Sequence, residues 1–292
     1  MPRTTLALTS FVSGEFSAKL DGRTDFQKYN TSCKTLENFL VHPQGAATRR
    51  VGTQFIAEVK SSAAKTRLIP FEFSTTQTYI MEFGNNYIRF FKDKGQILSG
   101  GSAYEIATPY ATSELFDIKF AQSADVMYLC HPNHDVRKLS RTGHTSWTLA
   151  TVSFSGSPSP GISGSDNRPS CVSFFEQRLV FANTNNNPQT LFFSKSGDYE
   201  NMTTGTDADD AMIYTIASNQ VNAIQFLKAQ RTLIVGTTGG EFTVSADGTD
   251  AAITPTNIAI KRQSSYGSAN VDAQPAGNAT LFLQRAKRKI RE

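Results

Sequence analysis

One sequence pattern recurs along most of the chain and limits what it can fold into. A short apolar run is followed by a turn and then by a second apolar run, as in "YIMEF", Gly84-Asn85-Asn86 and "YIRFF". Two apolar runs around a short Gly/Asn turn indicate a β-hairpin. The pattern occurs in five copies, which start about fifty residues apart, at Ile69, Ile118, Val172, Ile224 and Val271. This spacing is the period at which the blades of a β-propeller recur.

The repeat therefore predicts an all-β fold, a β-propeller built from repeated antiparallel hairpins. One hairpin unit cannot bury both of its faces, whereas radial stacking of such sheets around an axis buries them. The predicted strand pairs are 79–83 with 87–91, 126–130 with 136–140, 179–182 with 190–194, 233–235 with 241–245, and 281–283 with a return as far as Ile290. Because the fifth copy is unfinished, we expect an incomplete propeller that needs strands from a longer protein or a partner. A β-sandwich with irregular hairpins is the alternative.

The composition agrees with strands and excludes several classes of protein. The chain of 292 residues is 39% hydrophobic and 18% charged, with 21 Phe and abundant Ser, Thr, Asn and Gly. Its net charge of +4 is spread along the chain, unlike the basic patch of a nucleic-acid binder. No apolar run is long enough to cross a bilayer, and the N-terminus is too polar for a signal peptide. The three cysteines are odd in number and far apart, which predicts buried thiols in a reducing compartment.

Two stretches carry metal-ligating residue types. In "CHPNHD", Cys130, His131 and His134 lie close together and His144 could add a ligand, as zinc requires. A hairpin turn rich in Pro and Asn explains the same residues without a metal. In "TGTDADDA" the chain offers the carboxylates of Asp207, Asp209 and Asp210, but it lacks the glycine and the distal glutamate of a calcium-binding EF-hand. We predict a turn and a solvated acidic loop, with no metal and no cofactor.

Catalytic residues do not stand out. The stretch "SADGTDAAI", with Ser245 and Asp247, weakly resembles the S-x-D-x-G type loop of sialidase propellers, but it occurs once and lacks the aromatic residue that ends that loop. No carboxylate pair suited to a glycosidase and no Ser-His-Asp arrangement can be recognised. In "GTTGGEF", Gly239-Gly240 suits a tight turn, because no Lys-Ser/Thr follows as in a phosphate loop. We therefore predict a protein that is not an enzyme.

The segment "QRAKRKIRE" is the most basic part of the chain. Its positive charges come from Arg285, Lys287, Arg288, Lys289 and Arg291. Clustered Lys and Arg attract nucleic-acid phosphates. An exposed hairpin turn, or an edge strand protected against unwanted pairing, accounts for the same charges and is the interpretation that we favour.

The N-terminal segment carries a specific framework of residues. It reads F-x-x-G-E-x-S-x-x-L, G-R-x-D-x-x-K-Y, C-x-x-L-x-N-F, P-x-G and R-R-x-G-T-x-F, in that order. This framework resembles the start of the tail nozzle proteins of short-tailed bacteriophages, also called tail tubular protein B. Later stretches such as "KFAQSADVMYLCHPNH" and "LIVGTTGGEF" are similar to the same family, so the resemblance covers nearly the whole chain. The matching residues are Phe11, Gly14, Glu15, Leu20, Gly22, Arg23, Asp25, Lys28, Tyr29, Leu36, Asn38, Pro43, Gly45, Arg49, Arg50, Gly52, Thr53 and Phe55.

The chain departs from the family at two positions. Such proteins often have a second glycine after P-x-G and a proline before the last glycine, where this chain has Ala46 and Val51. These departures leave the tightness of that turn open. Family members are also usually much longer, which agrees with the unfinished fifth repeat.

The resemblance implies a structural role in a virion. Nozzle proteins form a hexameric ring below the portal and its adaptor ring, and this ring closes the tail and conducts DNA during ejection. Residues 1–62 would be a partly extended docking segment and residues 63–292 the propeller blades. The expected partners are further copies of the chain, the adaptor protein, tail fibres or spikes, and DNA that passes without sequence-specific binding. The expected location is the virion tail, after assembly in the bacterial host cytoplasm.

Within this interpretation, Arg23, Arg49 and Arg50 are candidates for subunit docking. The planar guanidinium group pairs with carboxylates through two hydrogen bonds, which suits Arg to interfaces. The alternative function is a glycan-binding or glycan-cleaving β-propeller used in host recognition.

Overall fold

The computed structural model describes residues 7–156, 158–217, 221–248 and 251–292. The chain divides into two compact units, Met1–Phe55 and Ile56–Glu292. Residues 56–60, which the resemblance assigns to the docking segment, lie on the second unit, where Lys60 Nζ is 2.6 Å from Glu105 Oε1. No helix among the described residues is long and apolar enough to span a membrane.

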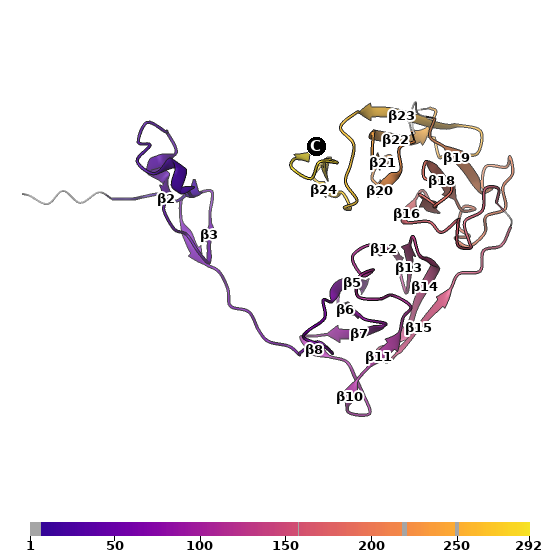
Figure 1. Ribbon diagram of the computed structural model, residues 1–292, viewed down its shortest axis with the longest axis horizontal. Coiled ribbons are helices and arrows are strands. Elements are labelled where there is room, and N and C mark those ends of the chain that lie inside the picture. The colour runs from indigo at the N-terminus through magenta and orange to yellow at the C-terminus, as the bar shows by residue number, and fades with distance from the viewer. Residues whose placement is uncertain (1–6, 157, 218–220, 249–250) are drawn as a thin grey trace, which may run out of the picture. The chain divides into compact units, whose positions relative to one another are not determined.

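The second unit is an all-β propeller of five sheets arranged in a ring (Figure 1). The first sheet contains β5 (Arg67–Ser74), β6 (Gln77–Gly84), β7 (Tyr87–Lys92), β8 (Gly95–Gln96) and β11 (Glu105–Ala107). The second contains β12 (Lys119–Ser123), β13 (Val126–His131), β14 (His134–Gly143) and β15 (Ser146–Thr151). The third contains β16 (Cys171–Phe175), β17 (Arg178–Ala182), β18 (Thr190–Phe193) and β19 (Met212–Thr215). The fourth contains β20 (Ile224–Ala229), β21 (Leu233–Thr237), β22 (Gly240–Ala246) and β23 (Ile258–Ser264). The fifth contains β24 (Gln274–Ala276), β25 (Ala279–Leu283) and β26 (Ile290–Arg291).

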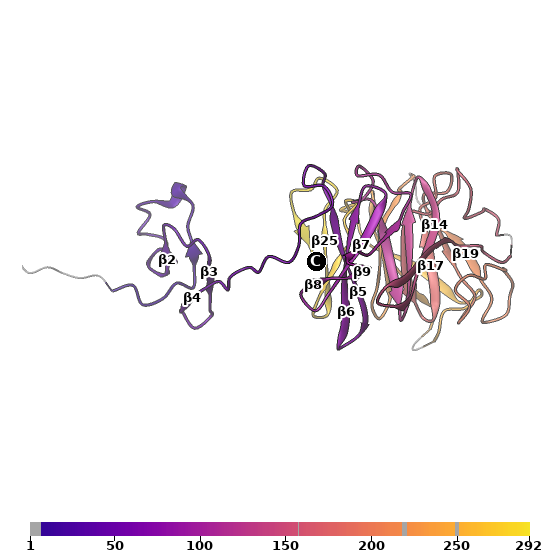
Figure 2. The ribbon, with the colours of Figure 1, turned by 90° about the horizontal axis from the view of Figure 1, so that it is seen from below.

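This architecture confirms the predicted fold class. Every predicted strand pair is present and antiparallel, and strands of successive sheets run side by side (Figure 2). Each repeat begins within three residues of the start of the first strand of its sheet. The short hairpin β9 (Leu98–Ser99) and β10 (Ser102–Ala103) lies in the connection before β11. The β-sandwich alternative is wrong.

The hydrophobic core lies between neighbouring sheets, because alternate residues of each strand point to opposite faces. Between the first and second sheets, the ring of Trp147 is stacked on Phe90 with centroids 4.4 Å apart, and the ring of Phe71 meets it edge-on at 4.8 Å. Between the fourth and fifth sheets the buried cluster is smaller and contains Phe226, Ala273 and Phe282. The fifth sheet is thus held by less apolar contact than the others.

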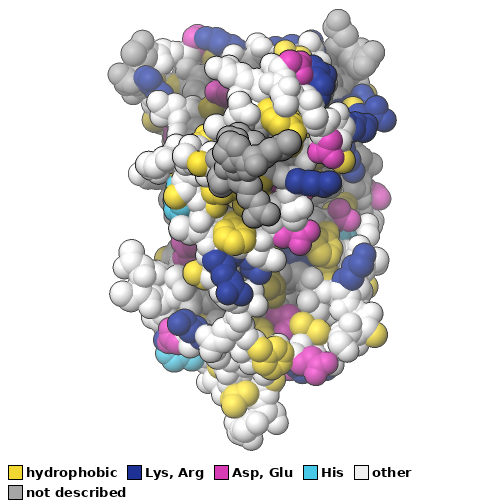
Figure 3. Space-filling view, turned by 90° about the vertical axis from the view of Figure 1, so that its left-hand side faces the viewer, with side chains coloured by type: hydrophobic (Ala, Val, Ile, Leu, Met, Phe, Trp, Pro, Cys, Tyr) yellow, Lys and Arg dark blue, Asp and Glu magenta, His cyan; other side chains and the backbone are white. Residues whose placement is uncertain are grey.

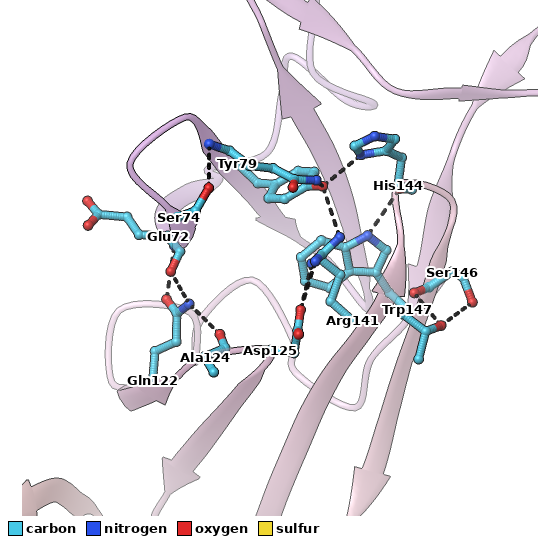
Figure 4. A network of polar contacts seen from close by, with 12 residues as sticks. Glu72, Ser74, Tyr79, Gln122, Ala124, Asp125, Arg141, His144, Ser146 and Trp147 are labelled. Carbon is cyan, nitrogen blue, oxygen red and sulfur yellow. Dashed lines mark hydrogen bonds and ion pairs between the residues drawn. The ribbon is translucent and has the colours of Figure 1, made fainter.

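Polar contacts add to the packing between the first and second sheets (Figure 4). Tyr79 Oη lies 2.7 Å from His144 Nδ1 and accepts a hydrogen bond from Arg141, whose guanidinium pairs with Asp125 at 2.8 Å. The indole of Trp147 donates to the His144 carbonyl at 3.1 Å. His144 therefore contributes to the contact between these two sheets.

The first unit is built from short strands. β1 (Gly14–Glu15) pairs in parallel with β2 (Ser32–Cys33), and β3 (Phe39–Val41) pairs antiparallel with β4 (Ala47–Arg49). Two 3-10 turns, Ala18–Leu20 and Tyr29–Thr31, connect them.

Candidate functional site

The stretch that carries the arginine pair forms the hairpin of β3 and β4. The turn is closed by hydrogen bonds from His42 N to the Ala46 carbonyl at 2.8 Å and from Gly45 N to the His42 carbonyl at 2.9 Å. Gly45 has φ +103°, and a Cβ at this position would lie 2.9 Å from Ser10 Oγ. Glycine is therefore required at 45, whereas the turn closes with alanine at 46. This stretch is a hairpin turn.

The three candidate docking arginines differ in how they are engaged. The guanidinium of Arg23 donates two hydrogen bonds of 2.7 Å to Asp25, and this pairing lowers the pKa of the Asp25 carboxyl. Arg50 Nε donates to Asn38 Oδ1 at 3.3 Å. The side chain of Arg49, on the exposed β4, makes no hydrogen bond or ion pair with any described residue. Arg49 thus carries the charge that is most available to a partner, and the docking role of all three residues remains a prediction.

The first unit has no hydrophobic core within residues 7–55. Gly45 is the only buried residue in that range, and Val51 and Phe55 are 81% and 79% exposed. The main-chain groups of residues 51–55 form no hydrogen bond with any described residue. We call residues 7–55 the arm. Its exposed large apolar side chains are Leu8, Val12, Phe26, Phe39, Leu40, Val51 and Phe55.

The propeller has an apolar groove on the outer face of its first sheet, which we call the outer groove. Strand alternation points Leu68 of β5 and Ile80 of β6 away from the core, where they are 63% and 42% exposed. The groove has a volume of about 610 Å³, and Ile56, Val59 and Phe91 also line it. Unpaired apolar faces of this kind mark interaction sites.

Polar contacts hold residues 56–60 beside the outer groove. The pKa of the Glu105 carboxyl is lowered, and the hydrogen bond from Lys60 is the largest cause. Arg89 Nε donates to the same carboxylate at 3.1 Å and lowers this pKa further. Lys60 Nζ also lies 5.0 Å from the ring centroid of Tyr87. The Tyr87 hydroxyl donates to buried Glu82 at 2.5 Å, and burial together with this contact raises the pKa of Tyr87 to about 12. The irregular segment that leads into the propeller is therefore anchored at Lys60.

A second cavity lies on the propeller axis, where the innermost strands meet. It has a volume of about 360 Å³ and is lined by β12, β16, β20 and the residues around Asp272. Lys119 Nζ lies 2.6 Å from Asp272 Oδ1, so an ion pair joins the second sheet to the chain entering the fifth. The Lys119 side chain is only 9% exposed. A cavity of this size is suited to a small molecule and is far too small for a DNA duplex.

Two of the residues weighed as zinc ligands do come together, with a partner that the sequence did not indicate. His131 and His134 face each other across the β13–β14 turn, and Glu114 lies beside them, with the three ligand atoms within 4.8 Å of one another. Glu114 Oε2 lies 2.9 Å from His134 Nε2 and accepts from Ala111 N at 2.9 Å, while Oε1 accepts from Asn133 Nδ2 at 3.2 Å. Glu114 is twenty residues from His134 in the chain, so no local spacing indicates it.

As arranged, this cluster is hydrogen-bonded rather than open to a metal. His131 Nδ1 accepts the N–H of Asn133 at 3.1 Å, so in the neutral ring the proton is on Nε2, which is buried and has no partner among the described residues. Burial lowers the pKa of His131 and favours this neutral form. A metal would need a lone pair on that nitrogen. Cys130 is buried in the core between the second and third sheets, and His144 contacts Tyr79, so neither completes a site.

The acidic loop has a structural role. Lys195 Nζ lies 3.0 Å from Asp209 and 3.4 Å from Asp210. The fully buried Arg178 donates hydrogen bonds to the carbonyl oxygens of Ala208 and Asp210, both at 2.6 Å. These contacts bind the loop to the third sheet and pair the carboxylates of Asp209 and Asp210 with Lys195.

The basic C-terminal segment is partly engaged in packing. The Arg291 guanidinium lies 4.2 Å from the ring centroid of Tyr266, and Arg285 donates to the Thr238 carbonyl at 3.5 Å. Lys287, Arg288 and Lys289 are exposed at the β25–β26 turn. On the face shown in Figure 3, Lys and Arg side chains are scattered among acidic and hydrophobic ones, without a continuous basic patch.

The fold and these surfaces define an all-β propeller protein with an N-terminal arm that lacks a core. No protein-family model matches the chain, and no curated protein matches it. Among solved structures, the crystal structure of BamB from Moraxella catarrhalis is similar, with a TM-score of 0.35 and 9% sequence identity, over 82% of this chain and 74% of that chain. A likeness of this extent carries no argument about function.

Proposed function

We propose that the chain is a structural component of a phage tail, a subunit of the nozzle ring below the portal and adaptor. The observation that carries this proposal is the N-terminal residue framework, which lies in an arm without a core. A segment of nearly fifty residues that buries almost nothing gains too little free energy from hydrophobic burial to be stable alone. Docking onto a partner would supply the burial that the arm lacks, as we expect of a subunit in a ring.

The axis of a single propeller is too narrow to hold the DNA path in such a ring. Because Lys119 and Asp272 bridge that axis, the duplex would run along the common axis of several copies and not through a single propeller. The subunits would close or open this channel by the position of their loops. Scattered charge on such a lumen favours passage, because a continuous basic stripe would hold the phosphates and slow the DNA.

The role of the arginine pair is tested by replacing both residues. We expect Arg49→Ala/Arg50→Ala to weaken ring assembly and virion completion, since the exposed Arg49 guanidinium pairs with a carboxylate of a partner in the assembled state. Lys19→Ala, which removes an exposed positive charge from the arm outside the residue framework, is the control. Unchanged assembly of the double variant would remove the docking role of the pair.

The location of the protein tests the proposal as a whole. An antibody against the chain should label the tail tip or collar of intact virions in negative-stain electron microscopy. Virions without label, with the protein found only in infected cells, would overturn the proposal. Binding of the purified chain to a glycan array would then support the alternative of a host-recognition propeller.

A further inference from the structure

We propose that the cavity on the propeller axis binds a small organic monocarboxylate, whose carboxylate pairs with Lys228 and whose apolar part lies against Phe226. We call this space of about 360 Å³ the axial cavity. The proposal concerns a ligand of a single propeller. It goes beyond the role in a phage tail and does not depend on that role.

The walls of the axial cavity are complete within the described residues. The lining residues belong to 119–122, 171–174, 226–229 and 272–274, on or next to the innermost strands of the second to fifth sheets (Figure 1). The ion pair of Lys119 with Asp272 joins the first of these segments to the last. The site is therefore formed without the first sheet and without residues beyond 274.

The charges on these walls do not balance. Lys119, Lys228 and Asp272 are the charged residues among the described ones that line the cavity. Asp272 compensates Lys119, whereas the half-buried Lys228 forms no side-chain hydrogen bond or ion pair with any described residue. A partly buried charge without a partner has lost some of its hydration and has gained no contact in return. The cavity thus favours a ligand that brings one negative charge.

The apolar part of the walls limits the kind of anion. Phe226 and Lys228 are two residues apart on β20, so they lie on the same face of this strand. Phe120 and Phe174 add further aromatic side chains to the lining. A doubly charged phosphate would have to lose more hydration than a carboxylate and would also meet the charge of Asp272. The walls therefore favour a single carboxylate on an apolar body.

An adjoining cavity provides a route of entry. It has a volume of about 400 Å³ and is lined by residues at the β12–β13, β16–β17 and β20–β21 turns. Gln122, Phe174 and Ala229 line both cavities, so the two share a boundary. Lys228 directly precedes Ala229, which places it next to this boundary. A ligand that enters with its carboxylate toward Lys228 would place its apolar part deeper, beside Phe226.

The test measures binding of benzoate, a monocarboxylate with an apolar ring, to the full-length chain by ligand-observed NMR. Benzamide has nearly the same shape without the charge, and inorganic phosphate has the charge without an apolar body. Lys228→Met keeps an apolar side chain and removes the ammonium, whereas Lys228→Arg keeps the positive charge. Lys261→Met, at an exposed position of β23 outside the cavity, is the matched control. Far-UV circular dichroism and thermal melting verify that each variant is folded.

We expect the wild-type chain to bind benzoate with a Kd of about 1 mM, as suits so small a ligand. Benzamide should bind at least about tenfold more weakly, because it lacks the hydrogen bond between two charged groups. Lys228→Met should reduce the affinity for benzoate to that for benzamide, while Lys228→Arg and Lys261→Met should bind benzoate like the wild type.

Four results would overturn the inference. They are no binding of benzoate, equal binding of benzoate and benzamide, unchanged affinity for benzoate in Lys228→Met, and tighter binding of phosphate than of benzoate. The comparison of the three ligands on the wild-type chain needs no substitution, so it tests the inference even where a variant does not fold.

Discussion

At the scale of single residues, polar side chains that pair with distant parts of the chain hold the loops in place. Glu114 connects the loop before β12 to the β13–β14 turn through His134 and Asn133. Burial raises the pKa of Glu114, but hydrogen bonds from His134, from the main chain of Ala111 and from Asn133 outweigh it and lower the pKa from 4.5 to about 2. The folded protein thus favours the ionised carboxylate.

This shift predicts how stability depends on pH. A carboxyl group whose pKa is lowered on folding stabilises the protein above its unfolded pKa and loses that contribution as the pH falls through the folded value. The contribution of Glu114 should therefore be full above about pH 4.5 and should vanish toward pH 2. We expect Glu114→Gln to lower the free energy of unfolding by about 1–2 kcal/mol at pH 7. Urea unfolding at a series of pH values measures the difference, and a difference that does not shrink between pH 4.5 and pH 2 would contradict this account.

A second residue prediction concerns Arg178. Its buried guanidinium satisfies carbonyl oxygens of Ser194, Ala208 and Asp210. Arg178→Met keeps much of the side-chain volume but leaves these acceptors unpaired, so we expect a loss of about 2–4 kcal/mol in the free energy of unfolding. Chemical denaturation measures this loss of unfolding free energy. Arg168→Met, at a partly exposed position, is the comparison. Equal effects of the two substitutions would show that burial of Arg178 is not what matters.

At the scale of elements, the fifth sheet is joined to the rest of the ring by one ion pair, a small apolar cluster and a few hydrogen bonds to the fourth sheet, such as that from Ser268 N to the Thr237 carbonyl at 2.8 Å. Lys119 Nζ and Asp272 Oδ1 are 2.6 Å apart, and Lys119 is nearly buried. Lys119→Met removes the charge from the axis and leaves Asp272 without its partner. We expect protease cleavage within residues 270–292 to become several times faster, while the first to third sheets remain intact. Mass spectrometry of the fragments identifies the cut sites, and unchanged cleavage would mean that the apolar contacts suffice.

The strands themselves were predictable to different degrees. The second and third strands of each sheet are short apolar runs around a turn, so their pattern predicts them directly. The outermost strands β11, β15, β19 and β23 were not predicted. β15 and β23 are edge strands whose mixed polar and apolar residues are mostly exposed or half-buried, and they are strands because of the neighbour they pair with.

At the scale of the whole molecule, stability should be distributed unevenly around the ring. Sheets in a propeller contact only their neighbours, so each interface contributes separately. Trp147, the only tryptophan, is buried between the first and second sheets, whereas the cluster between the fourth and fifth sheets is small. We expect amide hydrogens of β25 to exchange faster than those of β13 and β17 by at least about tenfold. Hydrogen exchange followed by mass spectrometry measures this order, and uniform protection would show that the ring unfolds as one unit.

The sequence by itself determined the all-β class, the five repeats and the hairpin within each repeat. These depend on local alternation and on turn residues, which act over a few positions of the chain. It also indicated that His131 and His134 are neighbours, because one turn separates them.

Only the tertiary structure decided which distant groups meet. Glu114 reaches His134, Lys119 reaches Asp272 across the axis, and the arm is left without a core. The arrangement of the sheets around the axis brings together Lys119 and Asp272, which are 153 positions apart, and local sequence patterns carry no information about such contacts. Packing of the first sheet against the second leaves Leu68 and Ile80 on the opposite, exposed face. The sequence does not show this, since the alternating pattern of a strand is the same whether its second face is covered or open.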